Sequence, residues 1–570
     1  MSRLTLHLSR SVVFVALLGT LLFCGSALGQ VDAGAVRGTV TDRSGAVVTN
    51  AKVTLTNDAT GLSVTAVTSR DGTYTFGPIR IGPYTIDVEA AGFRKATTQL
   101  TINVQEQARA DFQLVPGAAS ETVVVTAVAA QLQTQDASVG TVATSQEVND
   151  LPLNGRNYTF LAQLGAGVTK LNPTRGLDAT GSFVANGLTT VHNNYMLDGI
   201  DNNNDTVDFL NGAAYANLPP PDAIQEFKVQ TSNFSAEFGR AGGAVVNAAV
   251  KSGTNEFHGS AWEFLRNDFF DAVDVSKWCF SELTTHNPCT TKKDTLRRNQ
   301  FGAAAGGPIV KNRLFVFGDY EGTRIRQSTL HKPTVPTLAE SQAGFLDYRD
   351  RFSTTSSTHT DLLGRSFSDA TVFDPATTRT VTAGSPDPVT HLVASGSGYV
   401  RDPFYVGSIG NQTNFTTPAQ QDLMNQLPSG RIDSNALKLL QLYPTANVPG
   451  AFSQNYVIDR SRPDDNNHFD IRVDNNFSQR DQLFGRVSYS RRLANFPGDF
   501  TGDADNTGFG GGAFTDRSLN LAVSETHTFS TTLINEARFG YSRLRTSSQP
   551  PSALISGVPA KYGIQGKCIL

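Results

Sequence analysis

The second half of the chain alternates apolar and polar residues with a period of two. In HFDIRVD, residues 468–474, every second residue is polar or charged and Phe, Ile and Val lie between, and the pattern recurs within residues 483–490 and 519–541. Successive side chains of a β-strand point to opposite faces, so these segments predict strands with one apolar and one charged face. A soluble sandwich would not usually turn Arg and Asp inward, whereas a transmembrane β-barrel turns them toward a wet lumen. We therefore predict part of an antiparallel transmembrane β-barrel over residues 254–570.

Two further segments refine this barrel prediction. QFGAAAGGPIVKNRLFVFGDYEGTR, residues 300–324, predicts a hairpin with a short turn at Gly307 to Arg313. Residues 328–455 are polar and weakly periodic, so we expect them to form largely an extracellular loop. Only about six to eight barrel strands can be recognised, and the final KYGIQGKCIL is not an aromatic-terminated strand. We expect the chain to be a fragment of a longer barrel.

The N-terminus predicts export. Residues 1–10 carry Arg3, His7 and Arg10, residues 12–24 form an almost unbroken apolar run, and Ala27-Leu28-Gly29 places small residues before Gln30. This order is typical of a secretory signal peptide, residues 1–29, cleaved before Gln30. The alternative is an uncleaved anchor helix, but the run is shorter than the ~20 apolar residues that span a bilayer.

Residues 30–117 predict a small β-sandwich. The segment GAVRGTVTDRSGAVVTNAKVTLTND reads as strand, turn and strand, and Asp71-Gly72 marks a second hairpin turn further on. About seven short strands at this spacing indicate two packed sheets. The core candidates are Val53, Leu55, Tyr74, Phe76, Tyr84 and Ile86.

A β-prone run stands by itself in the linker that follows, residues 118–137. This run is ETVVVTA: Glu121, Thr122, Val123, Val124, Val125, Thr126 and Ala127. An unpaired strand of three valines is an aggregation hazard, so we expect it to pair with another strand. A partner chain could supply that strand by β-augmentation. The alternatives are that the run is the last strand of the sandwich or a plain linker.

Residues 138–253 are polar and rich in Asn and Gly. Within them AIQEFKVQ and GGAVVNAAVKSG predict two short strands. The glycine-rich stretch between them, residues 239–243, permits tight turns with positive φ and close backbone packing. We expect a small α+β domain here.

Composition and motifs exclude several classes of protein. The 47 basic and 51 acidic residues give a net charge of −4, so nothing favours nucleic acid as a partner. No histidine begins H-x-x-E or H-E-x-x-H, and G-x-S-x-G and P-loop motifs are absent from the sequence. We therefore predict no enzyme activity, no catalytic residue, no cofactor and no metal site. The acidic stretches 198–205 and 503–508 lack EF-hand spacing, and turn formation is the favoured interpretation over calcium binding.

Cys279 and Cys289 are separated by nine residues in a polar stretch. An oxidising compartment would allow them to form a disulfide, which is the interpretation we favour. A metal site that also uses His286 is the alternative, although this spacing fits no zinc template well.

Two sets of motifs resemble known families. G-x-V-x-D-x-x-G at residues 38–45, T-x-x-D-G-x-Y-x-F at 68–76 and G-x-Y-x-I-x-V-x-A-x-G-F at 82–93 resemble the carboxypeptidase regulatory-like domain. LPLNGRNYTFLAQLGAGV, SFVANGLTTVHNNYMLDGIDNNND and the run from PPPDAIQEF to FLRND resemble, in their order and spacing, the plug of TonB-dependent outer-membrane receptors of the Oar-like branch.

This resemblance implies a fold, partners and a location. It implies a plug over residues 138–253 and a TonB box at residues 121–127, the segment that pairs with the inner-membrane energy transducer TonB. The implied partners are the TonB complex, outer-membrane lipid and an unidentified extracellular ligand, and the implied location is the outer membrane of a Gram-negative bacterium. Receptors of this family close about 22 strands, more than can be recognised here. The alternative function is surface binding or adhesion without transport, with glycan binding by the sandwich as one form.

Overall fold

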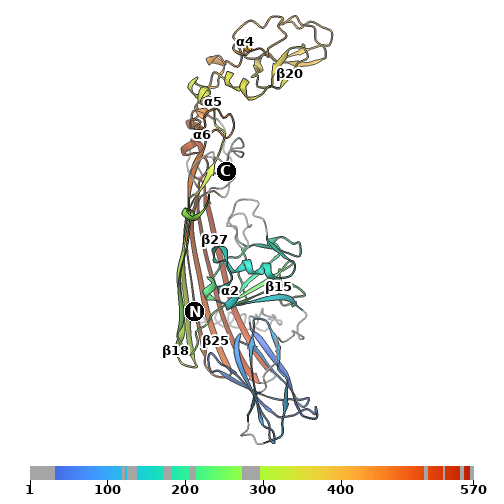
Figure 1. Ribbon diagram of the computed structural model, residues 1–570, viewed down its shortest axis with the longest axis vertical. Coiled ribbons are helices and arrows are strands. Elements are labelled where there is room, and N and C mark those ends of the chain that lie inside the picture. The colour runs from blue at the N-terminus through green and yellow to red at the C-terminus, as the bar shows by residue number, and fades with distance from the viewer. Residues whose placement is uncertain are drawn as a thin grey trace, which may run out of the picture.

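The computed structural model describes residues 33–117, 122–124, 138–170, 182–204, 214–272, 295–505, 507, 511–530, 533–551 and 557–564. The predicted signal peptide and the Cys279–Cys289 disulfide lie outside the described residues and stay predictions. The described residues are mostly β-strand and fall into four parts, two of which lie at the ends of the long axis of the molecule and two side by side between them (Figure 1). No helix in these ranges is long and apolar enough to cross a membrane.

The first part is a β-sandwich, as predicted. One sheet has the order β4-β1-β7 with β8 also paired to β1, and the other has the order β3-β2-β5-β6-β9. All six predicted core residues are buried between the sheets, and Gly72 takes the positive φ of 68° that its turn requires. The strands are β1 (Gly34–Asp42), β2 (Lys52–Asn57), β3 (Ser63–Val67), β4 (Thr73–Ile79), β5 (Gly82–Glu89), β6 (Lys95–Ile102), β7 (Gln107–Arg109), β8 (Phe112–Leu114) and β9 (Thr122–Val124).

The second part, here called the central unit, is a mixed five-stranded sheet of order β10-β15-β16-β13-β14. Both predicted strands are present, as β15 and β16. A capping box begins the short helix α2 (Ser145–Asp150): Thr144 and Glu147 each accept the other's backbone N–H. The strands are β10 (Val139–Thr144), β13 (Asn194–Leu197), β14 (Ile200–Asp201), β15 (Ile224–Ser232) and β16 (Val245–Val250), with a separate hairpin of β11 (Val168–Lys170) and β12 (Phe183–Ala185).

The glycine-rich stretch of the central unit behaves differently from the prediction in one respect. Within residues 239–243, Arg240 takes a positive φ of 62°. Gly239, Gly242 and Gly243 do not take a positive φ. Close packing does require a glycine at Gly243, because an added Cβ would lie 2.4 Å from Asn193 Oδ1. The prediction of close packing is confirmed, and the prediction of positive φ at the glycines is wrong.

The third part is a curved sheet of seven antiparallel strands joined in sequence order, and it is not closed into a barrel. The predicted hairpin is present, with its turn at residues 311–313. The predicted faces are confirmed: Asp470, Asp474 and Arg486 are at most 1% exposed on the inner face, whereas Ile471 is 50% exposed on the outer face. The strands are β17 (His258–Asn267), β18 (Leu296–Val310), β19 (Leu314–His331), β24 (Ile458–Asn476), β25 (Asp481–Phe496), β26 (Gly512–Ser530) and β27 (Leu533–Gln549).

The fourth part, here called the outer segment, joins β19 to β24 and covers residues 332–457. The sequence predicted largely loop, but the segment has small cores of its own, in one of which Phe367 stacks on Phe415 at 4.9 Å. Arg365 is fully buried and pairs with Asp402 at 2.6 Å. Its elements are α3 (Leu338–Gln342), β20 (Thr358–Thr360), β21 (Ser366–Ser368), β22 (Arg379–Val381), β23 (Gly398–Val400), α4 (Pro418–Gln421) and α5 (Ser434–Leu440); α6 (Val558–Lys561) follows β27.

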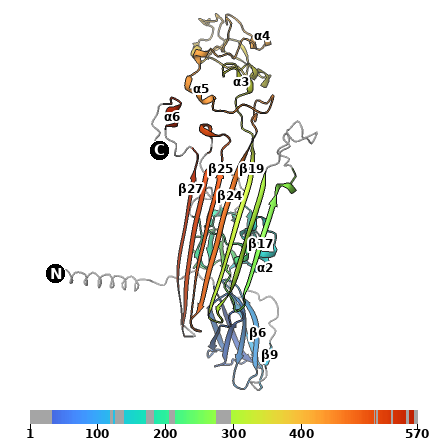
Figure 2. The ribbon, with the colours of Figure 1, turned by 90° about the vertical axis from the view of Figure 1, so that its left-hand side faces the viewer.

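The sandwich and the outer segment lie at opposite ends of the curved sheet, and the central unit lies against its concave face (Figures 1 and 2). The sandwich lies at the end with the short turns, where the backbone N–H of Asn255 donates to the carbonyl of Ala59 at 3.0 Å. The curved sheet of seven strands is here called the wall. Gly540 of β27 lets the central unit approach the wall, since an added Cβ would lie 2.5 Å from Ile200 Cγ2. The polar inner face is therefore covered by a separately folded domain.

Candidate functional site

A buried carboxylate of the central unit contacts two arginines of the barrel wall. Asp198 lies in the turn between β13 and β14, takes a positive φ of 49°, and is fully buried. Arg486 Nε donates to Asp198 Oδ2 at 2.5 Å, and Arg472 Nη1 donates to Asp198 Oδ1 at 3.1 Å. The same Oδ1 accepts the backbone N–H of Val250 at 3.0 Å. One side chain thus joins the turn, β16 and the wall.

The strand register places the two arginines side by side on the inner face of the wall. Arg472 of β24 and Arg486 of β25 are directly opposite each other. Like charges in that position repel, so the pair needs buried counter-charges. Asp198 supplies one and Asp474, 3.2 Å from Arg472, supplies another. Arg486 also donates to Asn520 Oδ1 at 2.7 Å, which spreads the contact over three neighbouring strands.

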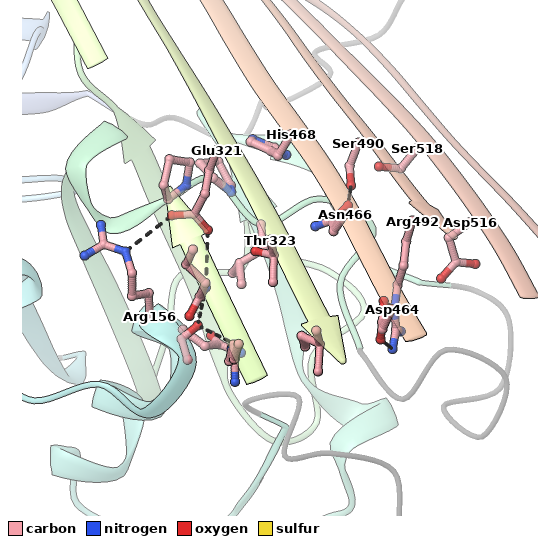
Figure 3. A pocket seen from close by; sticks show the side chains of 18 of the residues that line it. Arg156, Glu321, Thr323, Asp464, Asn466, His468, Ser490, Arg492, Asp516 and Ser518 are labelled. Atoms are coloured by element: carbon pink, nitrogen blue, oxygen red, sulfur yellow. Dashed lines mark hydrogen bonds and ion pairs between the residues drawn. The ribbon is translucent and has the colours of Figure 1, made fainter. Parts of the chain in front are cut away.

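A cavity of about 500 Å³ lies between the central unit and the wall, toward the outer segment. Figure 3 shows that its labelled side chains come from both sides, with Arg156 on the central unit and the others on the wall strands. Polar residues predominate among those that line it: Arg156, Asn157, Gln300, Glu321, Thr323, Asp464, Asn466, His468, Ser490, Arg492, Asp516 and Ser518.

The charges in this cavity form ion pairs. Arg156 Nε lies 3.3 Å from Glu321 Oε2, and its guanidinium stacks 4.3 Å from the ring of Phe264. Arg492 Nε donates to Asp464 at 2.9 Å (Figure 3). A ligand held here would therefore meet hydrogen-bonding groups of both signs, and it would contact the central unit and the wall together.

The sandwich contacts the central unit and the wall on the side of the central unit opposite the first cavity. A second cavity, of about 410 Å³, is lined there by residues of all three parts. Arg80 of the sandwich pairs with the wall residue Asp474 at 3.1 Å. Lys228 Nζ of the central unit donates to the carbonyl of Gln105 at 3.0 Å.

Glu226 makes a buried contact between the sandwich and the central unit. Its carboxylate accepts the backbone N–H of Val104, and both residues are buried. Glu226 lies on β15, outside the membrane-spanning strands. Burial raises its pKa to about 7, the Val104 hydrogen bond opposes this rise, and nearby Glu106 adds to it.

This pKa predicts that docking of the sandwich on the central unit weakens as pH rises. A carboxyl whose pKa is raised in the docked state holds a proton there that it loses on undocking, so docking is strongest below its ordinary pKa near 4.5 and weakens up to about pH 7. We expect the exchange protection of the Val104 amide, corrected for intrinsic rates, to fall by up to about tenfold per pH unit in that window. Glu226→Gln should remove this dependence and Glu237→Gln should keep it. An equal pH dependence in Glu226→Gln would contradict the assignment.

The structure places only part of the predicted TonB-binding segment. Of residues 121–127, the described residues are Thr122–Val124, which form β9 and pair in parallel with Lys95–Thr97 of β6. β9 is the last strand of its sheet, so its other edge carries no further strand among the described residues. This is the arrangement of the alternative interpretation, in which the run extends the sandwich.

Sequence reasoning missed Asp198. It assigned the acidic stretch 198–205 to turn formation, and Asp198 is indeed in a turn, but its carboxylate binds the wall. The charged residues on the inner face of HFDIRVD were the signal that could have identified Asp198, because buried charges there require counter-charges from the domain that fills the lumen.

Comparison with known families agrees with this architecture. The family model of the outer membrane beta barrel domain matches residues 249–568, more than half of the chain, and that of the carboxypeptidase regulatory-like domain matches residues 35–115. The chain therefore belongs to the outer-membrane β-barrel family and is an outer-membrane protein.

Individual proteins and solved structures are similar to parts of the chain. The chain is 25% identical to the TonB-dependent transporter Oar of Myxococcus xanthus over 352 residues, which cover 60% of this chain and 31% of that protein. Among solved structures it is similar to the ferric enterobactin receptor PfeA of Pseudomonas aeruginosa, with 11% identity, a TM-score of 0.36 and coverage of 72% and 41% of the two chains. It is also similar to the outer membrane transporter YddB of Escherichia coli, with 12% identity, a TM-score of 0.33 and coverage of 72% of this chain and 48% of that chain. The chain thus spans less than half the length of each.

Proposed function

We propose that the chain acts in TonB-dependent transport across the outer membrane. In this proposal residues 1–29 are the signal peptide, 30–117 the regulatory-like sandwich, 138–253 the plug and 254–570 the wall with its outer segment. The observation that carries the proposal is the fully buried contact of Asp198 with Arg472 and Arg486. It seats a separate domain on the polar face of the wall, as a movable plug requires.

The segment at residues 121–127, within the linker 118–137, is the proposed site of TonB pairing. Its described strand, β9, is a short edge strand, and main-chain groups on such an edge can pair with a strand of another protein. TonB either adds to the free edge of β9 or replaces β6 as its partner. The unidentified extracellular ligand would occupy the cavity beside Arg156 and Glu321.

The connection to the central unit supports a pulling mechanism. Residues 128–138 join the segment to β10, which among the described strands is an edge strand of the central sheet, paired with β15. Force on an edge strand breaks its ladder hydrogen bonds one after another, so the force needed is lower than for shearing a central strand. Release of β10 would expose the edge of β15 in the central unit.

Retention on immobilised TonB tests this proposal. The protein, purified from outer membranes in detergent, should be retained by the periplasmic domain of TonB. A variant that lacks residues 121–127 should pass through, and Asp201→Asn, an exposed change in the central unit, should be retained. Equal retention of the deletion variant would contradict pairing at residues 121–127, and failure of the wild type to be retained would favour surface binding or adhesion without transport.

A further inference from the structure

Two aspartates lie opposite each other on the inner face of the wall. Asp319 of β19 and Asp470 of β24 are direct cross-strand partners. Asp319 is 7% exposed and Asp470 is fully buried. Two carboxylates in this position repel, and burial in a medium of low polarity strengthens the repulsion. The pair therefore needs a cation or a proton.

A histidine completes the group. His468, 3% exposed, lies two residues before Asp470 on the same face, and its Nε2 lies 2.8 Å from Asp470 Oδ2. Asp319, His468 and Asp470 each offer one ligand atom, and these atoms all lie within 4.8 Å of one another. Two acidic oxygens and an imidazole nitrogen are ligands that zinc, manganese and iron(II) accept.

The hydrogen bonds of the group leave the ligand positions open. Within the described part of the chain, both carboxylate oxygens of Asp319 and Nδ1 of His468 are buried and accept no hydrogen bond from an N–H or O–H donor, and the polar neighbour of the Asp319 carboxyl is the carboxyl of Asp470. Asp470 is bonded on both oxygens, because it also accepts from the hydroxyl of Ser488. The group therefore keeps lone pairs that no hydrogen bond uses, on Asp319 and on His468, and each oxygen of Asp470 has a second lone pair.

We propose that Asp319, His468 and Asp470 form a site for one divalent transition-metal cation in the barrel wall. Each of the three side chains offers one ligand atom, and the hydroxyl of Ser488 holds the Asp470 carboxylate in place. His468 also lines the cavity of about 500 Å³, which gives a cation a path to the group. The bound cation would join β19 to β24 beside the Asp198 contact.

Metal binding by the purified protein tests the proposal without any reference to TonB. After chelator treatment, the protein in detergent should bind one tight equivalent of Co²⁺, seen in its visible absorption and displaced by Zn²⁺. Asp319→Asn and His468→Gln should each weaken this binding at least tenfold. The matched control is His527→Gln, because His527 lies in a half-exposed group with Asp481 and Glu525. This control should leave the tight equivalent unchanged.

A second measurement uses the unaltered protein, so the test does not depend on the variants folding. Mn²⁺ bound to the wild type should show coupling to a histidine nitrogen in pulsed electron paramagnetic resonance, and this coupling should persist in His527→Gln. Absence of a tight Co²⁺ equivalent in the wild type would overturn the proposal and assign a shared proton to the carboxylates. Loss of the tight equivalent in His527→Gln would also overturn it.

Discussion

Val124→Pro is expected to abolish energised uptake while leaving ligand binding at the cell surface intact. Proline has no backbone N–H, so it removes a donor from any ladder that residues 121–127 form with a TonB strand. The proposed ligand cavity lies on the far side of the central unit and does not include this segment. The measurement is accumulation of substrate by energised cells, compared with binding to the same cells after the proton-motive force is collapsed.

Two controls separate this effect from a general defect. Val124→Thr keeps a β-branched side chain and the N–H, so uptake should be close to that of the wild type. Gln133→Pro places the same residue in the linker beyond the segment and should also transport. Undiminished uptake by Val124→Pro would sink the assignment of residues 121–127, and loss of surface binding would show that the change had damaged the fold instead.

Asp198→Asn is expected to loosen the central unit from the wall by ~3 kcal/mol or more. Removal of one partner from a buried ion pair typically costs ~3–5 kcal/mol, because the remaining charge stays buried. Arg486 is fully buried against Asp198, and Arg472 would keep Asp474, at 3.2 Å, as an acidic partner in the wall. The measurement is native-state hydrogen exchange in detergent, followed at the amides of β13 and β16.

The matched control for this change is Asp201→Asn in the same turn region. Asp201 is half exposed and lies 3.6 Å from Arg240, so its charge should contribute less than ~1 kcal/mol. The amides of the wall strands should keep their protection in both variants. Equal protection of β13 and β16 in Asp198→Asn and Asp201→Asn would show that the buried contact does not seat the central unit.

Local periodicity made the wall and the sandwich predictable. In HFDIRVD each residue falls on the face that alternation assigns to it, since strand geometry alone fixes that face. The hairpin turn at residues 311–313 was likewise marked by its own residues. These features depend on neighbours in sequence, and no knowledge of the rest of the fold was needed.

Contacts between distant residues were not predictable. Asp198 and Arg486 are 288 positions apart, so charge in the wall showed that a partner was needed without showing which residue it was. The metal ligands come from two strands separated by the whole outer segment, and no ligand spacing could reveal them. The small cores of that segment, such as Phe367 on Phe415, join irregular stretches that have no period to detect. The sequence did not decide which strand pairs with β9, because so short a strand can pair with the edge strand of more than one sheet.

Cross-linking in living cells tests the central claim most directly. A photoreactive amino acid in place of Val124 should, after irradiation, give a cross-linked product whose mass is that of the protein plus that of TonB. The same residue in place of Ser69, in an exposed turn of the sandwich, should give none. Absence of the adduct at position 124, or an equal adduct at position 69, would contradict TonB pairing at residues 121–127.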